Sequence, residues 1–150
     1  MLKPSSISPS SELSAFLKGK VIVGNPDGTT SEVAVYDDWE RPTNELPTDF
    51  LTVYLNGDPE GIGMGADFAK GNIIVSLYSK LNDDGSVKTK RIKKILSQFD
   101  GLIEKKQTEN YYFEYEPTRF ITPTTPNQSS GYSITSLNLR WHTTQDFSNS

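Results

Sequence analysis

The chain has no cysteine and only one histidine among its 150 residues. Disulfides, and zinc or iron–sulfur sites built on thiolates, are therefore excluded. The chain also lacks a run of about 20 apolar residues, and its N-terminus lacks the apolar stretch of a secretory signal. We expect a soluble protein made in a cytoplasm, folded as one domain over 1–150 with a flexible arm at 1–11 and a polar tail at 143–150.

The sequence also lacks recognisable catalytic motifs. The segment GIGMG at 61–65 matches neither of the glycine patterns that hold phosphates, and no zinc-protease or EF-hand pattern occurs. His142 has no partner nucleophile or carboxylate that the sequence indicates, and the Asp pairs at 37–38 and 83–84 lie in turn-forming contexts. We therefore predict no catalytic residue, no cofactor, no metal site and no enzymatic activity.

One segment shows a clear helical period, KTKRIKKILSQFDGLIEKK from Lys88 to Lys106. Its apolar residues recur at a spacing that places them on one stripe of a helix. They are Ile92, Ile95, Leu96, Phe99, Leu102 and Ile103. The pattern predicts one long amphipathic helix over about 87–106, with its apolar stripe against a sheet. A shorter helix is expected from Glu12 to Lys18.

Strand-like segments lie on both sides of the expected long helix. They cover 20–23, 31–36, 50–55, 72–78, 111–115 with 119–121, and 132–141. The turn Asn25-Pro26-Asp27-Gly28 predicts a hairpin between the first two. The segment 57–72 contains five glycines and is expected to be a long loop. This order predicts an α+β fold, a mostly antiparallel sheet that carries the long helix and the short N-terminal helix.

Charge is unevenly distributed along the chain, whose net charge is −4. Residues 1–60 hold ten acidic and four basic side chains, whereas residues 61–110 hold six and nine. The basic residues Lys88, Lys90, Arg91 and Lys94, with Lys93, cluster at the start of the expected long helix, where they oppose the helix dipole. Contact with an acidic protein surface, such as the first sixty residues of another copy, is one interpretation. Contact with a nucleic-acid backbone and a plain solvated face are the alternatives.

Apolar residues within the glycine-rich segment form a second candidate interface. Ile62, Met64 and Phe68 stand among flexible glycines and would otherwise lie near solvent. We predict that they contact another subunit or partner, as we do for Lys88, Lys90, Arg91 and Lys94.

The element order resembles that of a known family. A short N-terminal helix, several strands, the segment RIKKILSQFDGLIEKK, and a strand pair ending in SGYSITSLNLRW are similar to the tail terminator, or tail completion, proteins of long-tailed bacteriophages. The resemblance covers about residues 12–142. It carries no catalytic motif, so no functional residue follows from it.

The resemblance implies a structural virion protein. Such a protein forms a ring, commonly hexameric, that caps the tail tube and joins it to the neck or head-completion protein. DNA would pass through the lumen without specific binding, and no membrane would be involved. The location would be the tail or neck of the virion, and the host cytoplasm during assembly. Another head–tail joining protein, or a nucleic-acid-binding module that uses the Lys88–Lys94 cluster, is the alternative.

Overall fold

The computed structural model describes the backbone of residues 8–37, 42, 46–62, 68–116, 121–127 and 130–144. Within these ranges the side chains of 58–62, 68 and 121–123 are not described.

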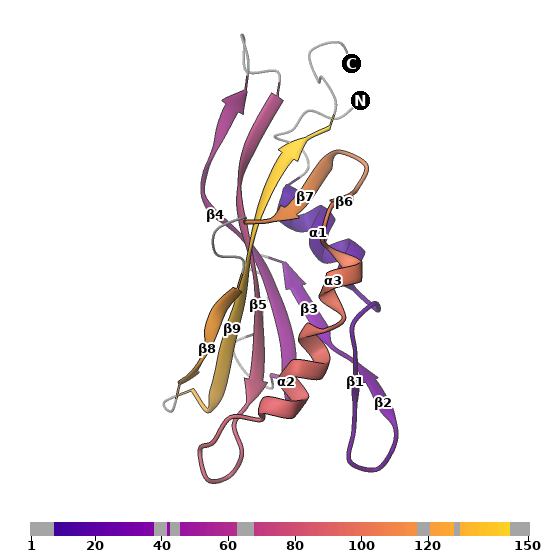
Figure 1. Ribbon diagram of the computed structural model, residues 1–150, viewed down its shortest axis with the longest axis vertical. Helices are drawn as coiled ribbons and strands as arrows, with labels where there is room; N and C mark the ends of the chain where they lie inside the picture. Colours follow the sequence, from indigo (N-terminus) through magenta and orange to yellow (C-terminus); the bar gives the residue numbers. More distant parts are fainter. Residues whose placement is uncertain are drawn as a thin grey trace.

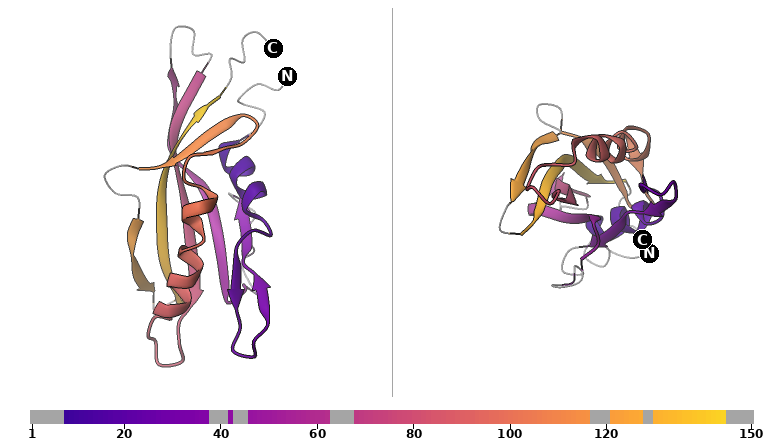
Figure 2. Two further views of the ribbon diagram at one scale, coloured as in Figure 1. Left: turned by 45° about the vertical axis from the view of Figure 1, so that its right-hand side comes forward. Right: turned by 90° about the horizontal axis from the view of Figure 1, so that it is seen from below.

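The main element of the described chain is one seven-stranded sheet, which is curled into a half-barrel (Figures 1 and 2). The strand order is β3-β4-β5-β9-β7-β6, and β8 also pairs with β9. The bounds are β3 Ala34–Asp37, β4 Asp49–Ile62, β5 Phe68–Lys80, β6 Lys106–Gln107, β7 Tyr111–Tyr115, β8 Ile121–Asn127 and β9 Tyr132–Thr143. All pairs are antiparallel except the parallel pair of β3 with β4.

The last strand, β9, lies in the middle of the sheet. One of its edges pairs with β5 along nearly its whole length. The other edge is shared, because β8 pairs with its first half and β7 with its second half. Alternate side chains of β9 are buried, as the period of two in a strand requires. Leu137, Leu139 and Trp141 of this buried row lie in the core.

A helix and a hairpin complete the core on the inner side of the curled sheet (Figure 2). Helix α1, Pro9–Leu17, begins at Ser8, whose side chain accepts a hydrogen bond from the backbone N–H of Ser10. The expected hairpin is confirmed, with strands β1 (Ile22–Gly24) and β2 (Thr30–Glu32). Leu13 and Leu17 of α1 and Val21 and Val23 of the hairpin belong to the same buried cluster as the sheet residues.

The prediction of one long helix over 87–106 is wrong. The segment forms α2, Thr89–Leu96, and a single turn α3, Phe99–Leu102, and the chain then enters β6. Between the helices, the side-chain amide of Gln98 accepts from the N–H of Ile22 at 2.9 Å and donates to its carbonyl at 2.7 Å. This pairing with β1 accompanies the break. Lys105 has a positive φ of 56°, which ends the helical segment before 106.

The apolar stripe of that segment nevertheless lies in the core. Ile92, Ile95, Phe99 and Ile103 are all at most 4% exposed. Helical spacing thus identified which side chains are buried, although it did not reveal that the helix is interrupted.

The fold class is corrected from α+β to mostly β. The glycine-rich segment 57–72, expected to be a loop, continues β4 and β5 on both sides of the undescribed residues 63–67. Residues 122–127, which lie outside the strands expected from the sequence, form most of β8. Residues 9–11 of the expected flexible arm belong to α1, and Thr143 of the expected tail is buried in β9.

Candidate functional site

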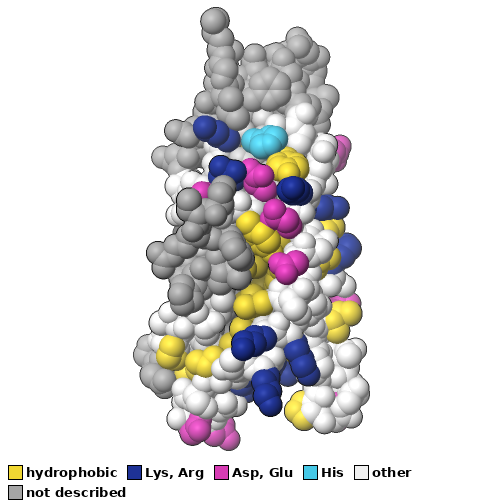
Figure 3. Space-filling model, in the orientation of Figure 1, with side chains coloured by type: hydrophobic (Ala, Val, Ile, Leu, Met, Phe, Trp, Pro, Cys, Tyr) yellow, Lys and Arg dark blue, Asp and Glu magenta, His cyan; other side chains and the backbone are white. Residues whose placement is uncertain are grey.

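The predicted basic cluster lies on α2. Lys90, Lys93 and Lys94 are exposed, and Lys88 is half-buried at the N-cap position. None of these four lysines forms an ion pair within the part of the chain that the structure describes. Lys and Arg side chains gather over the region of α2 in the lower part of Figure 3. The four ammonium groups are therefore available to an external partner.

Arg91, which the sequence grouped with these lysines, is engaged inside the molecule. Its Nε and Nη2 atoms donate to Oδ2 of the buried Asp49 at 2.8 and 2.6 Å. Asp49 also accepts from the Ser79 hydroxyl at 2.7 Å, and Arg91 Nη1 donates to the Gly24 carbonyl at 3.0 Å. Arg91 thus joins α2 to β4 and to the β1–β2 hairpin. Its guanidinium stabilises the fold and is not available to a partner in the way that the lysines are.

The predicted apolar interface lies at the tip of the β4–β5 hairpin. Ile62 and Phe68 are opposite each other in the last pair of this ladder. Met64 lies outside the described residues. The backbone thus brings two of the three residues together at one end of the molecule (Figure 1).

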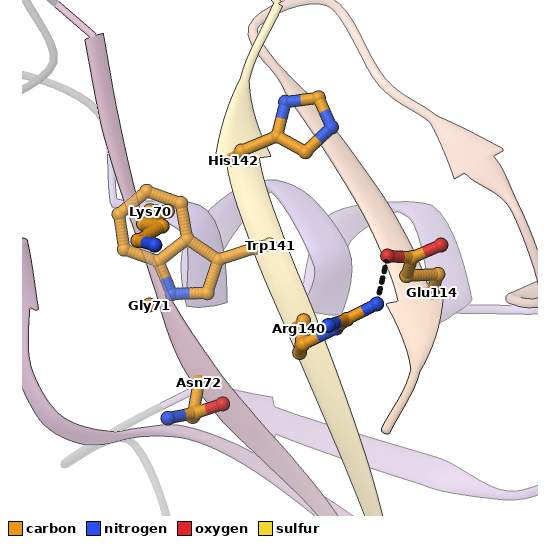
Figure 4. A pocket seen from close by; sticks show the side chains of 7 residues that line it. All are labelled: Lys70, Gly71, Asn72, Glu114, Arg140, Trp141 and His142. Atoms are coloured by element: carbon orange, nitrogen blue, oxygen red, sulfur yellow. Dashed lines mark hydrogen bonds and ion pairs between the residues drawn. The ribbon is translucent and has the colours of Figure 1, made fainter. Parts of the chain in front are cut away.

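A polar depression of about 330 Å³ lies where β5, β9 and β7 run side by side (Figure 4). Lys70 is paired in register with His142, and Asn72 with Arg140. Arg140 reaches across to β7, where its Nη2 atom forms an ion pair with Glu114 at 2.6 Å. The sequence did not predict this site. The sequence contained one indication of it, the alternation of the polar residues Asn138, Arg140 and His142 along one strand. The other lining residues belong to strands that are distant in sequence, so no local pattern connects them.

His142 is held by its neighbours in this depression. Its ring is stacked on Tyr112, with centroids 5.1 Å apart, and its Nδ1 atom lies 2.9 Å from the Thr143 carbonyl oxygen. Since a carbonyl only accepts, Nδ1 carries a proton and donates this hydrogen bond. No side-chain carboxylate or hydroxyl of the described residues is hydrogen-bonded to this ring.

Acidic side chains surround Tyr115 on the strand next to α3. The Tyr115 N–H donates to Glu104 at 3.2 Å, and its hydroxyl donates to Asp100 at 3.5 Å. The preceding residue, Glu114, projects to the opposite face of β7, where it is paired with Arg140. Burial raises the pKa of Tyr115, and the charges of Asp100 and Glu104 raise it further. Two negative charges, those of Asp100 and Glu104, thus lie beside Tyr115 at α3.

The described residues contain no group of three or more His, Cys, Asp or Glu side chains that could hold a metal ion. None of the described helices is long and apolar enough to span a membrane. Neither the comparison with protein-family models nor that with curated protein sequences finds a match.

Proposed function

We propose that the chain is a structural, ring-forming protein of the bacteriophage tail or neck, a tail terminator without enzymatic activity. The resemblance described above motivates the proposal. In this role the protein, as a hexamer, binds the tail tube on one side and the neck or head-completion protein on the other. It acts in the virion after assembly in the host cytoplasm, and DNA passes through the lumen without specific binding.

The observation that carries the proposal is the incomplete edge of β4. Strand β3 covers this edge only from Phe50 to Val53. From Tyr54 to Ile62, β4 has no strand partner on that side within the described residues, while its other edge is paired with β5. A row of unpaired backbone N–H and C=O groups is a template for a strand of another chain.

Such an edge suits a subunit of a closed ring. In a head-to-tail ring each subunit offers one surface to the copy before it and a different surface to the copy after it, so that an edge left open in the free subunit is completed in the assembly. The β4–β5 hairpin also extends to one end of the elongated molecule (Figure 1). Its tip carries the apolar pair Ile62 and Phe68.

Hydrogen exchange and light scattering test this proposal together. We expect light scattering to show a ring, at high concentration or on isolated tail tubes. The amides of Tyr54–Asn56 that point away from β5 should exchange rapidly before assembly and slowly after it. Paired amides of the same strand, in Phe50–Val53, are the internal control because β3 and β5 already cover both edges there. A strict monomer at high concentration that also fails to assemble on tail tubes would contradict the proposed function.

A further inference from the structure

The exposed side of α2 and α3 changes sign at Ser97. Opposite the buried stripe, the exposed residues run from Lys90 and Lys94 of α2 through Ser97, between the two helices, to Asp100 of α3 and to Glu104, which follows α3. Lys94 and Asp100 each stand three positions from Ser97, and Lys90 and Glu104 each stand seven positions from it. The basic half and the acidic half of this surface are therefore arranged symmetrically about one small residue. We call it the 90–104 face.

Both halves of the 90–104 face have charged residues besides these four. Lys93 is also exposed on the basic half and has no ion pair among the described residues. On the acidic half, Lys105 follows Glu104 and partly offsets its charge, and the nearby Glu114 of β7 is already paired with Arg140. The surface is thus positive on one side of Ser97 and negative on the other.

The centre of the face is different in character. Ser97 is exposed and small, and its hydroxyl is turned back to the Lys94 carbonyl at 2.9 Å. Next to it, Gln98 is hydrogen-bonded to Ile22, which is 46% exposed and is the large hydrophobic residue that the described surface leaves open. A small, partly apolar centre with charged flanks matches the usual anatomy of a protein interface.

We propose that the 90–104 face binds the same face of a second copy of this chain, antiparallel and about a twofold axis at Ser97. In this arrangement Lys94 of each copy meets Asp100 of the other, and Lys90 meets Glu104. An isologous contact of this kind makes each ion pair twice. If the two copies instead met in a parallel, displaced arrangement, the basic half of one copy would face the acidic half of the other. The remaining basic and acidic halves would then have no partner.

This contact is independent of the proposed function. A twofold contact joins two copies and closes on itself, so it cannot by itself build a larger ring. It would hold two free subunits, or two assembled rings, through surfaces that β4 does not use. The tests below therefore fail or succeed separately from assembly on tail tubes.

A single-cysteine variant tests where the axis lies. The chain has no natural cysteine, so Ser97→Cys introduces one thiol, and a disulfide forms only when the Cα atoms approach to about 4.4–6.8 Å. We expect rapid oxidation of this variant to a covalent dimer. The control, Lys18→Cys, places an exposed thiol at the end of α1 and is expected to crosslink much more slowly. Equal rates for the two variants would overturn the twofold arrangement.

Charge exchange tests the pairing. Sedimentation velocity should show a dimer of the natural protein at about 0.01 M salt, where the Debye length is about 30 Å, and a monomer at about 1 M, where it is about 3 Å. Both Lys90→Glu/Lys94→Glu and Asp100→Lys/Glu104→Lys should weaken the dimer at least about tenfold, and combining all four changes should restore it. Lys18→Glu/Lys80→Glu makes the same change in net charge elsewhere and should leave the dimer intact.

Some outcomes would overturn the proposal. A monomer at low salt, a dimer insensitive to salt, or a fourfold variant that remains as weak as either parent would each do so. If a reversed variant unfolds by circular dichroism, Ile22→Ser provides the test, because this exposed side chain lies outside the core and its loss should still weaken association. Binding of DNA that depends on Lys90 and Lys94 but not on Asp100 and Glu104 would instead assign the basic half to nucleic acid.

Discussion

At the scale of single residues, Gly71 of β5 has no room for a side chain. It is paired with Trp141 of β9, whose indole lies across it (Figure 4). A Cβ atom at this position would come within 2.9 Å of three atoms of the indole. Trp141 is 3% exposed and is packed edge-on against Tyr111, with centroids 5.4 Å apart, so it cannot move aside freely.

We therefore expect Gly71→Ala to lower the free energy of unfolding by about 1–3 kcal/mol, the usual cost of overpacking. Urea unfolding followed by tryptophan fluorescence measures it. Gly24→Ala is the matched control, because nothing lies within 4 Å of a Cβ atom at that position. Its effect should stay within about 0.5 kcal/mol. Equal effects of the two substitutions would show that Trp141 accommodates the methyl group.

Among the elements, α2 is joined to the sheet by the ion pair of Arg91 with Asp49, and to the β1–β2 hairpin by the hydrogen bond of Arg91 to Gly24. The Asp49 side chain is 3% exposed and that of Arg91 is 20% exposed, so removing the carboxylate would leave a poorly solvated guanidinium. We expect Asp49→Ala to destabilise the protein by about 3 kcal/mol, because a charge left unpaired in a buried site is costly.

A double-mutant cycle with Arg91→Met isolates the coupling between the two residues. The double variant should recover part of the loss, because no unpaired charge remains. The exposed pair of Arg140 with Glu114, at 45% and 31% exposure, is the comparison. Glu114→Ala should cost at most about 1 kcal/mol. If the losses of unfolding free energy in the two single variants simply added up in the double variant, Asp49 and Arg91 would not be directly coupled.

Local sequence signals were sufficient for some elements. The turn from Asn25 to Gly28 predicted the β1–β2 hairpin, and Gly28 has the positive φ of 87° that such a turn uses. The helical period of Ile92 to Ile103 identified the buried side chains of α2 and α3. These features depend on residues close together in the chain.

Other elements depend on contacts that no local pattern contains. The break between α2 and α3 coincides with the bonds from Gln98 to Ile22, a residue far away in sequence. Strand β8 includes Pro123 and Pro126, which a strand tolerates at an edge, and β9 is its only strand partner among the described residues. The polar depression at Arg140 and the charge symmetry about Ser97 likewise required the strand register and the exposure of each side chain.

For the molecule as a whole, the buried Tyr111 and the half-buried Tyr115 make the free energy of unfolding depend on pH in the alkaline range. Burial, together with the charge of Glu12, raises the pKa of Tyr111 to about 12, and burial also raises the pKa of Tyr115. In the unfolded chain a tyrosine ionises near pH 10. Above that pH the unfolded state therefore holds fewer protons than the folded state, and the free energy of unfolding falls as pH rises.

We expect the melting temperature to decline steadily from about pH 10 to about pH 12, and Tyr111→Phe to show a shallower decline. Spectroscopic titration of the phenol groups should show one fewer late-ionising tyrosine in this variant than in the natural protein. Tyr112→Phe is the control, since the Tyr112 ring is half-buried on the outer side of β7, stacked on His142. Identical slopes for the three proteins would contradict this assignment.

The place of β9 in the middle of the sheet has a consequence for biosynthesis. β9 follows β5, β7 and β8 along the chain, yet it provides an edge partner for each of them. While the ribosome is still making residues before Tyr132, the nascent chain can form the β4–β5 and β1–β2 hairpins but cannot close the sheet. Folding of this half-barrel is thus completed only after β9 has left the exit tunnel, and until then the second edge of β5 has no β9 partner and is a site where the nascent chain can aggregate.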